Sequence, residues 1–312
     1  MSAQVYRALN SAAAAPLPAA AAATTSEGAL VTILQAIILG IVQGLTEFLP
    51  ISSSGHLLVV PWLFNWHFLL ENPALNKTFD VALHLGTFFS LIAYFWRDIG
   101  RLLAAWVRTI AHRRLDAPEG KLAWLIIVST IPAAIVGVAF EDVIVTRLGQ
   151  PWTIAVLMIL FGLVMWVVDH TARLDRDVDA LTWGDALIIG VAQALALAPG
   201  VSRSGITMVT GLLLRLNREA AARYSFLMSI PVIGGAAAYK GLQVAQGGLP
   251  AGTTTPFAVG IVSAALSGFA AIWFVLAYLK RHSFDLFVIY RIAIGVGMLI
   301  LIITGVRAAT GV

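Results

Sequence analysis

Residues 49–56 of this chain read Leu49-Pro50-Ile51-Ser52-Ser53-Ser54-Gly55-His56, and residues 199–205 read Pro199-Gly200-Val201-Ser202-Arg203-Ser204-Gly205. They interrupt two apolar segments, 34–66 and 185–216. Because proline and glycine disfavour a continuous helix and serine caps the start of a new one, each stretch predicts a helix that breaks and then resumes. The fold depends on where these two breaks lie.

The composition places both breaks in a membrane. The chain has 312 residues, of which 59% are hydrophobic and 12% are charged, whereas soluble domains have about 25% charged residues. Too few polar residues remain to cover a water-facing surface, which excludes a soluble enzyme and makes membrane lipids a partner. Without cysteine there is no disulfide or thiol catalysis. The net charge of +4 comes from residues placed between apolar segments, so we expect no nucleic-acid partner.

The apolar segments predict an all-α polytopic membrane protein. Residues 1–29 form an Ala-rich, low-complexity arm that is expected to be disordered, and residues 30–312 form a single integral membrane domain. Since about 20 apolar residues span the hydrocarbon core, six segments are predicted transmembrane helices. They are 79–97, 121–140, 151–169, 222–241, 257–280 and 285–306. The two broken segments are predicted re-entrant hairpins, because irregular backbone at membrane depth must be packed in protein or line a polar cavity.

An internal repeat relates the two breaks. A shift of 150 residues places Ala36, Ile38, Gly40, Gln43, Leu45, Ser52, Ser54 and Gly55 on identical residues at 186, 188, 190, 193, 195, 202, 204 and 205. The repeat halves are about 33–170 and 183–307, each with one hairpin and three spans. Because three crossings is an odd number, the second half is expected to be inverted relative to the first.

The distribution of Lys and Arg predicts the orientation. If the basic segment between the first two spans is cytoplasmic, 13 of the 20 positive residues lie inside and both termini lie outside. The first hairpin then enters from the outer face and the second from the cytoplasmic face. Two full crossings in place of each hairpin would give the same orientation.

Glu47 is the first candidate functional residue. Gln43 lies four residues earlier and therefore on the same side of the helix. A carboxylate within a membrane segment is energetically unfavourable, and it usually marks a functional site. Ser52, Ser53, Ser54 and His56 follow within nine residues, so an acid, hydroxyls and an imidazole are available for acid-base or nucleophilic chemistry. The alternative is an interfacial carboxylate bonded to serine hydroxyls.

Arg203 gives the strongest single indication of a ligand. Ser202 and Ser204 flank it, a helix is expected to begin beside it, and Thr207 lies one turn further on. A guanidinium beside a helix N-terminus suits a phosphate group. The alternative is an arginine that balances the charge of Glu47 without contacting substrate. Two further polar residues, His84 and Arg291, lie inside predicted spans. His84 is either a buried hydrogen-bonded histidine or a catalytic one. Arg291 is expected to be a structural partner within the bundle.

The two motifs resemble those of a known family. Residues 43–56 are similar to the first signature of the bacterial undecaprenyl-diphosphate phosphatase family, of the bacitracin-resistance type, and residues 199–207 resemble its second signature, P-G-x-S-R-S-x-x-T. The similarity extends from about residue 33 to the C-terminus. The resemblance implies an enzyme of the bacterial inner membrane that hydrolyses undecaprenyl diphosphate to the monophosphate carrier of peptidoglycan synthesis, and it implies the same fold of two re-entrant hairpins in inverted repeats.

The resemblance also implies which residues act. Glu47, Ser53, His56 and Arg203 are the expected catalytic residues, and the expected substrate-binding residues are Gln43, Ser52, Ser54, Ser202, Ser204 and Thr207. A divalent cation, Mg²⁺ or Ca²⁺, is expected with Glu47 as a ligand. The family has Glu or Gln at the position of Gln43, so this chain has one carboxylate in the motif, and an acidic pair of metal ligands is not expected.

Ser53 is the favoured nucleophile in the resulting hypothesis, with Glu47 or His56 assisting it. His56 as the nucleophile, or a water activated by Glu47, remain open alternatives. A lipid-carrier flippase or an anion transporter is the rival function, because inverted repeats with broken helices are also typical of transporters. Whether the protein forms a homodimer stays open.

Overall fold

The computed structural model describes residues 31–66, 73–115, 117–247 and 252–310, and within these ranges the chain is entirely helical apart from turns and one isolated bridge, between Arg176 and Leu216. The all-α prediction is confirmed. The predicted arm, residues 1–29, lies outside the described residues.

The first break separates helix α2 (Ile33–Phe48) from α3 (Ser53–Phe64). Helix α2 ends because Leu49 precedes Pro50 and adopts the extended backbone that a residue before proline prefers. Ser52, with φ of 78°, then caps α3, and its Oγ accepts a hydrogen bond from Gly55 N. The serine-rich sequence therefore stops one helix and starts the next, as predicted.

The second break has the same local structure. Helix α8 (Trp183–Ala194) continues into a short 3₁₀ turn, η2 (Leu195–Leu197), and α9 (Arg203–Leu213) follows the break. Ser202 caps α9 with φ of 79°, and its Oγ accepts from Gly205 N. Ser52 and Ser202 are 150 residues apart, so the two repeated sequences adopt the same cap.

The remaining helices are long. They are α5 (Pro73–His112), which has a kink at Phe95, α6 (Pro118–Leu148), α7 (Pro151–Thr171), α10 (Arg218–Gly247), α11 (Thr254–Leu279) and α12 (Asp285–Ile303). A 3₁₀ turn, η1 (Val178–Ala180), lies between α7 and α8. Five segments in the described part of the chain are long and apolar enough to cross a membrane. They are Leu75–His112, Pro118–Phe140, Pro151–Thr171, Thr254–Leu279 and Asp285–Ile303. The chain is thus consistent with a polytopic membrane protein.

The span predicted at 222–241 lies in a helix whose two halves differ in burial. It forms part of α10, but α10 is not among the five apolar spans that the described residues contain. Its first half packs inside the protein: Ala220, Ala222, Tyr224, Phe226 and Met228 are all buried. The first half of α10 therefore packs inside the protein, whereas Pro231, Gly235 and Ala236 in its second half are exposed.

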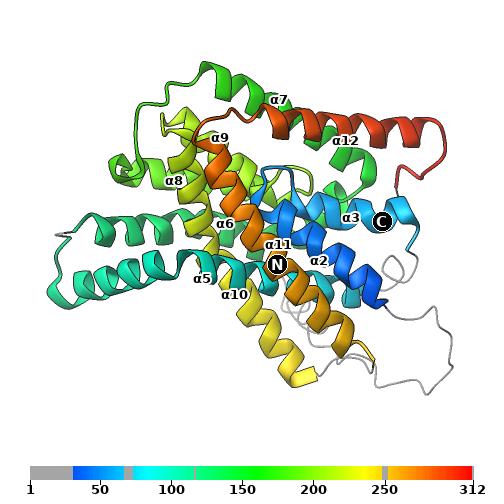
Figure 1. The fold of residues 1–312 in the computed structure, drawn as a ribbon, viewed down its shortest axis with the longest axis horizontal. Coiled ribbons are helices and arrows are strands. Elements are labelled where there is room, and N and C mark those ends of the chain that lie inside the picture. Colours follow the sequence, from blue (N-terminus) through cyan, green and yellow to red (C-terminus); the bar gives the residue numbers. More distant parts are fainter. Residues whose placement is uncertain (1–30, 67–72, 116, 248–251, 311–312) are drawn as a thin grey trace, which may run out of the picture.

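Each helix that precedes a break packs closely on a helix from the other half of the sequence. Helix α2 lies beside α11, and α8 lies against α6 (Figure 1). A Cβ atom added at Gly44 would lie 2.6 Å from Ala264 O, and one added at Gly190 would lie 2.6 Å from Ser129 O. Glycine at these two positions is what allows the helix backbones to approach so closely.

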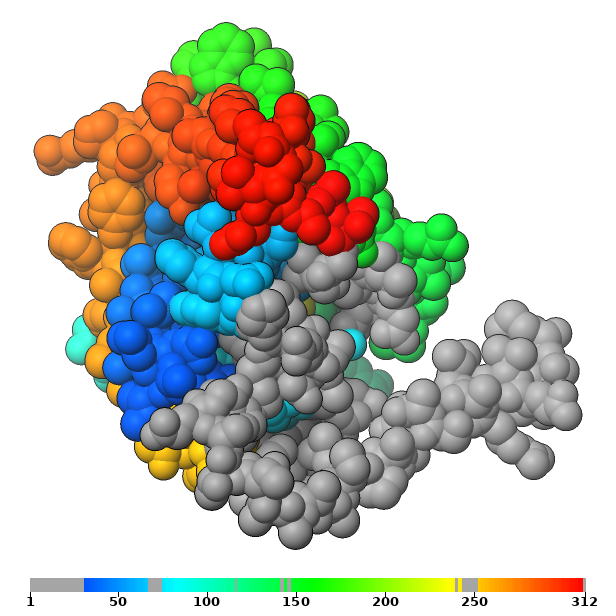
Figure 2. Space-filling model, turned by 90° about the vertical axis from the view of Figure 1, so that its right-hand side faces the viewer, coloured from blue at the N-terminus to red at the C-terminus, as the bar shows by residue number. Residues whose placement is uncertain are grey.

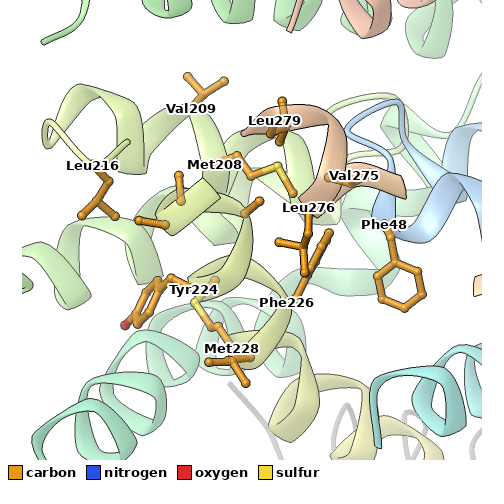
Figure 3. Packing of buried hydrophobic residues seen from close by; sticks show 14 of the residues in the cluster. Phe48, Met208, Val209, Leu216, Tyr224, Phe226, Met228, Val275, Leu276 and Leu279 are labelled. Carbon is orange, nitrogen blue, oxygen red and sulfur yellow. The ribbon is translucent and has the colours of Figure 1, made fainter. Parts of the chain in front are cut away.

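The main core forms where the two halves meet. Figure 3 shows Phe48 of α2, Met208 of α9, Phe226 of α10 and Leu276 of α11 in one buried cluster. A smaller cluster joins α3 to α12 through Trp62 and Met298, and the space-filling view shows these two segments in contact (Figure 2). The cores therefore hold both breaks between helices of both halves.

Candidate active site

Glu47 and Arg203 meet at the centre of the site. Arg203 Nη2 donates a hydrogen bond of 2.7 Å to Glu47 Oε1, across 156 residues of sequence. The side chain of Glu47 is 4% exposed and that of Arg203 is 14% exposed. Helix α2 ends just after Glu47 and α9 begins at Arg203, so the two breaks bring the acid and the guanidinium together.

The second oxygen of the Glu47 carboxylate binds two further side chains. Ser53 Oγ donates to Glu47 Oε2 at 2.5 Å, and Gln43 Nε2 donates to the same oxygen at 3.1 Å. His84 Nε2 lies 3.6 Å from it. The carboxylate is therefore placed to accept the proton of the Ser53 hydroxyl.

The two breaks are hydrogen-bonded directly to each other. Ser52 Oγ accepts from Gly200 N at 3.0 Å, and Ser204 Oγ donates to Leu49 O at 3.1 Å. Each break thus supplies a serine that satisfies a backbone group of the other, which fixes their relative position.

Arg291 of α12 is hydrogen-bonded to both breaks. Its side chain is fully buried, and it donates to Pro50 O at 3.1 Å and to Gly200 O at 2.7 Å. It also donates to Met158 O of α7 at 3.2 Å. Since all these acceptors are backbone carbonyls, Arg291 is a structural partner within the bundle, as its position in the last span suggested.

His56 is hydrogen-bonded to groups other than Glu47 and Ser53. Its Nδ1 lies 2.7 Å from Ser52 O, and its Nε2 lies 2.9 Å from the hydroxyl of Tyr290. A carbonyl only accepts, so Nδ1 carries the proton and, in the neutral ring, Nε2 accepts from Tyr290. The ring also stacks on Tyr290. Both nitrogens are thus occupied by groups other than Glu47 and Ser53.

The remaining predicted residues surround Arg203. Ser202 Oγ shares a hydrogen bond of 3.2 Å with Ser204 Oγ, and Thr207 Oγ donates to Arg203 O at 2.8 Å. Thr207 also bonds to Ser225 of α10. Ser54 is partly buried in the first turn of α3, and its hydroxyl has no partner among the described residues. Ser54 is therefore the one predicted hydroxyl of the described site left open for a ligand.

Two buried polar atoms of the site lack a partner. They are Arg203 Nη1 and Gln43 Oε1. An unsatisfied buried polar atom is unfavourable by about 1–3 kcal/mol. Arg203 Nη1 is a donor that a phosphate oxygen can satisfy, and Gln43 Oε1 is an oxygen ligand that a cation can satisfy.

The oxygen atoms of the site are too few to hold a divalent cation alone, but they fit one that is also bound by the phosphate oxygens of a substrate. Within the described part of the chain, no three His, Asp or Glu side chains cluster as metal ligands do. Magnesium typically takes one or two protein carboxylates and completes its coordination with phosphate oxygens and water. Gln43 Oε1 and the Glu47 carboxylate fit that pattern.

His84 and Tyr290 lie outside both motifs; the sequence left His84 open between a buried hydrogen-bonded and a catalytic histidine, and it did not indicate Tyr290. His84 Nδ1 donates to Asp80 O at 2.7 Å, which leaves Nε2 directed toward Glu47, and its side chain is 30% exposed. A polar residue inside an apolar span was a usable signal for His84. Tyr290 gave none, because tyrosine is common in membrane helices.

Comparison with known proteins identifies the family of this chain. Residues 36–297 match the family described as bacitracin resistance protein BacA. A protein of Pelobacter propionicus named undecaprenyl-diphosphatase is 46% identical over 275 residues, which is 88% of this chain and 98% of that relative. A protein of the same name from Moorella thermoacetica is 48% identical over 262 residues, 84% of this chain and 94% of the relative. The matched residues cover most of the chain and include both breaks, Glu47 and Arg203. The chain therefore belongs to the bacitracin resistance protein BacA family.

Proposed function

We propose that this protein is a membrane phosphatase that hydrolyses undecaprenyl diphosphate to undecaprenyl phosphate and inorganic phosphate, and so recycles the lipid carrier for cell-wall synthesis. The observation that carries the proposal is the cluster of Glu47, Ser53 and Arg203, in which one carboxylate is hydrogen-bonded to both a hydroxyl and a guanidinium. The names of the relatives support the choice of substrate.

Ser53 is the nucleophile in this proposal. Its Oγ attacks the terminal phosphorus, its proton passes to Glu47 Oε2, and the bond from phosphorus to the bridging oxygen breaks to release the prenyl monophosphate. Water then hydrolyses the phosphoserine. The 2.5 Å hydrogen bond supports Glu47 as the base, whereas the two ring bonds of His56 favour a positioning role for that residue.

Arg203 stabilises the phosphoryl group during transfer. Charge on the three equatorial oxygens is the main feature to be neutralised, and the monophosphate leaving group needs little protonation. Arg203 already donates Nη2 to Glu47, so the partnerless Nη1 is the donor that faces substrate in this proposal. The open Ser54 hydroxyl and the amides at the start of α9 would add further donors.

Gln43 and Glu47 are the residues that would hold a divalent cation. The partnerless Gln43 Oε1 supports this assignment, because its amide nitrogen is already committed to Glu47 and its oxygen has no donor. When bound together with the diphosphate, such an ion supplies charge neutralisation at the phosphoryl oxygens.

We propose further that the two broken segments are re-entrant hairpins in inverted repeats, within the bacterial inner membrane. The matching caps at Ser52 and Ser202 support the repeat. Helix α2 has 16 residues and α3 has 12, so each is shorter than the roughly 20 residues that a crossing needs. The connection between α5 and α6 and the end of α12 lie on opposite sides of the view in Figure 1, consistent with a cytoplasmic basic loop and an outer C-terminus.

Phosphate release by purified protein tests the proposal. Detergent-solubilised wild type is expected to release phosphate from a prenyl diphosphate, and EDTA is expected to stop the reaction until Mg²⁺ or Ca²⁺ is restored. Glu47→Ala is expected to lower kcat by at least about a hundredfold, because base and cation ligand are lost together. Glu219→Ala is the matched control, since this half-exposed carboxylate pairs only with Lys280 among the described residues.

The same assay separates the rival function. A flippase or an anion transporter moves its substrate between compartments and releases no phosphate in detergent micelles. Absence of phosphate release from folded wild type, with cation present, would therefore count against the phosphatase and for transport.

A further inference from the structure

A second cluster of positive charge lies at the end of the bundle, away from Glu47 and Arg203. It lines a cavity of about 260 Å³ between the end of α5, the start of α6 and the start of α8. Its lining residues are Thr109, Arg113, Arg114, Leu115, Trp124 and Trp183. None of them belongs to the candidate active site, so the mechanism leaves this cavity without a role.

Arg113 and Arg114 are positive side chains that pair with no carboxylate among the described residues. Both are exposed, and neither has a hydrogen bond or an ion pair with another residue in the described part of the chain. Two other arginines of the connecting segments and helix ends are paired, because Arg176 binds Asp185 and Arg218 binds Asp169. Two adjacent guanidiniums facing a cavity predict an anionic ligand, and their planar forks suit phosphate oxygens.

The other walls of the cavity are aromatic and apolar. Trp124 Nε1 donates to Thr109 Oγ1 at 2.9 Å, which fixes the indole against α5. Trp183 is 44% exposed at the first residue of α8, and Leu115 is 51% exposed. Tryptophan is enriched at the boundary between hydrocarbon and water. A ligand here would therefore meet charge at one end and an apolar surface at the other.

The cavity also lies at the level where the apolar sequence begins. The charge-free stretch of α6 starts at Leu122, two residues before Trp124, and that of α8 starts at Ala186, three residues after Trp183. Basic pockets between membrane helices at this level are suited to lipid headgroups. A soluble anion would gain nothing from the exposed tryptophan and leucine, so the lining favours a lipid over free phosphate.

We infer that this cavity binds the phosphate of an anionic phospholipid, with Arg113 and Arg114 holding the phosphate and Trp183 and Leu115 contacting the glycerol and upper acyl chains. The occupant is a bilayer lipid and not the prenyl diphosphate substrate. The inference goes beyond the proposed phosphatase activity and does not depend on it.

Native mass spectrometry of the full chain in detergent tests the inference. Phosphatidylglycerol is titrated against phosphatidylethanolamine, and the affinity for each bound lipid is measured. Wild type is expected to prefer phosphatidylglycerol, and Arg113→Gln/Arg114→Gln is expected to weaken that binding about tenfold or more. The control Arg97→Gln/Arg281→Gln removes the same charge from two exposed arginines outside the cavity, and it is expected to bind as wild type does.

Equal affinity of the cavity variant and the control variant would overturn the inference. Displacement of phosphatidylglycerol by an equal concentration of inorganic phosphate would also overturn it, because the site would then be a simple anion site. If the double variant does not give monodisperse protein, the single variant Arg114→Gln carries the same test, with an expected loss of at least about threefold. Unchanged affinity in that variant would likewise overturn the inference.

Discussion

Ser53 and Ser54 are neighbours in the same helical turn, but their surroundings differ. Ser53 Oγ lies 2.5 Å from a carboxylate oxygen, whereas the hydroxyl of Ser54 has no partner in the described structure. A serine becomes an effective nucleophile only when a base is within hydrogen-bond distance. The chemical distinction between the two residues therefore arises from the position of Glu47.

Replacing these serines one at a time tests this distinction. Ser53→Ala is expected to lower kcat by at least about a thousandfold, because the nucleophile itself is lost. Ser54→Ala is expected to change kcat/KM by about tenfold at most, since it removes a single ligand contact. The measurement is steady-state phosphate release with equal amounts of folded protein. A Ser53→Ala variant that keeps more than a tenth of wild-type kcat would show that water attacks phosphorus directly.

Arg203 makes a second residue-scale prediction. Arg203→Lys keeps the positive charge but loses the planar fork that serves Glu47 and a phosphate oxygen together. Activity is expected to fall at least tenfold, equivalent to about 1.4 kcal/mol or more of transition-state stabilisation. The kcat/KM of purified protein is the measurement. Near-normal turnover would remove the phosphate-binding role and leave Arg203 as a counter-charge to Glu47.

For single residues, the sequence predicted which side chains cluster better than it predicted the hydrogen-bond partners of each side chain. It placed Glu47, Ser53 and Arg203 at two breaks, and the structure brings those breaks together. The resemblance placed His56 in the active site, yet the ring bonds to Ser52 and Tyr290. Spacing along a chain limits how far apart two residues can lie, but the direction of a side chain depends on tertiary neighbours such as Tyr290, 234 residues away.

Among the contacts between helices, the one between α2 and α11 determines the position of Glu47. Glu47 is near the end of α2, and Gly44 one turn earlier allows the backbone of α11 to approach. Gly44→Val is expected to destabilise the protein by about 1–3 kcal/mol through overpacking, and to lower activity because Glu47 moves with the helix. The melting temperature in detergent and the phosphate-release rate are measured together.

Gly297→Ala in α12 is the matched control for Gly44. A Cβ atom there would have no neighbour within 4 Å, and alanine in a helix is more favourable than glycine by about 0.5–1 kcal/mol. The control is expected to melt at or slightly above the wild-type temperature with normal activity. Equal melting temperatures for both variants would mean that α2 can shift away from α11 without loss.

The elements were largely predictable because their signals are local. Pro50 and Pro199 determine where α2 and the α8 segment end, and the serines that follow cap the next helices. The segment 222–241 was less predictable, because apolar composition does not tell a buried helix from one that faces lipid. Only the packing of Tyr224 and Phe226 in the core distinguishes these cases.

Arg291 links the two halves of the whole molecule. It donates to a carbonyl of each break, and the serines of the breaks bond across the same junction. Residues near positions 50, 200 and 290 of the sequence are thus hydrogen-bonded to one another at one junction. The proposed entry of the two breaks from opposite faces of the membrane predicts which parts of the chain lie on each side, and this orientation can be tested.

The absence of cysteine makes that test direct, because wild type gives no background with thiol reagents. Val306→Cys is expected to react with a membrane-impermeant maleimide in intact spheroplasts, since residue 306 is 57% exposed just after α12, on the proposed outer side. Ala180→Cys is exposed in the connection between the two halves, and it is expected to react only after permeabilisation. Both variants should keep phosphatase activity, which confirms their fold. Labelling of both residues in intact spheroplasts would contradict the proposed orientation, in which α10, α11 and α12 make three crossings between residues 180 and 306.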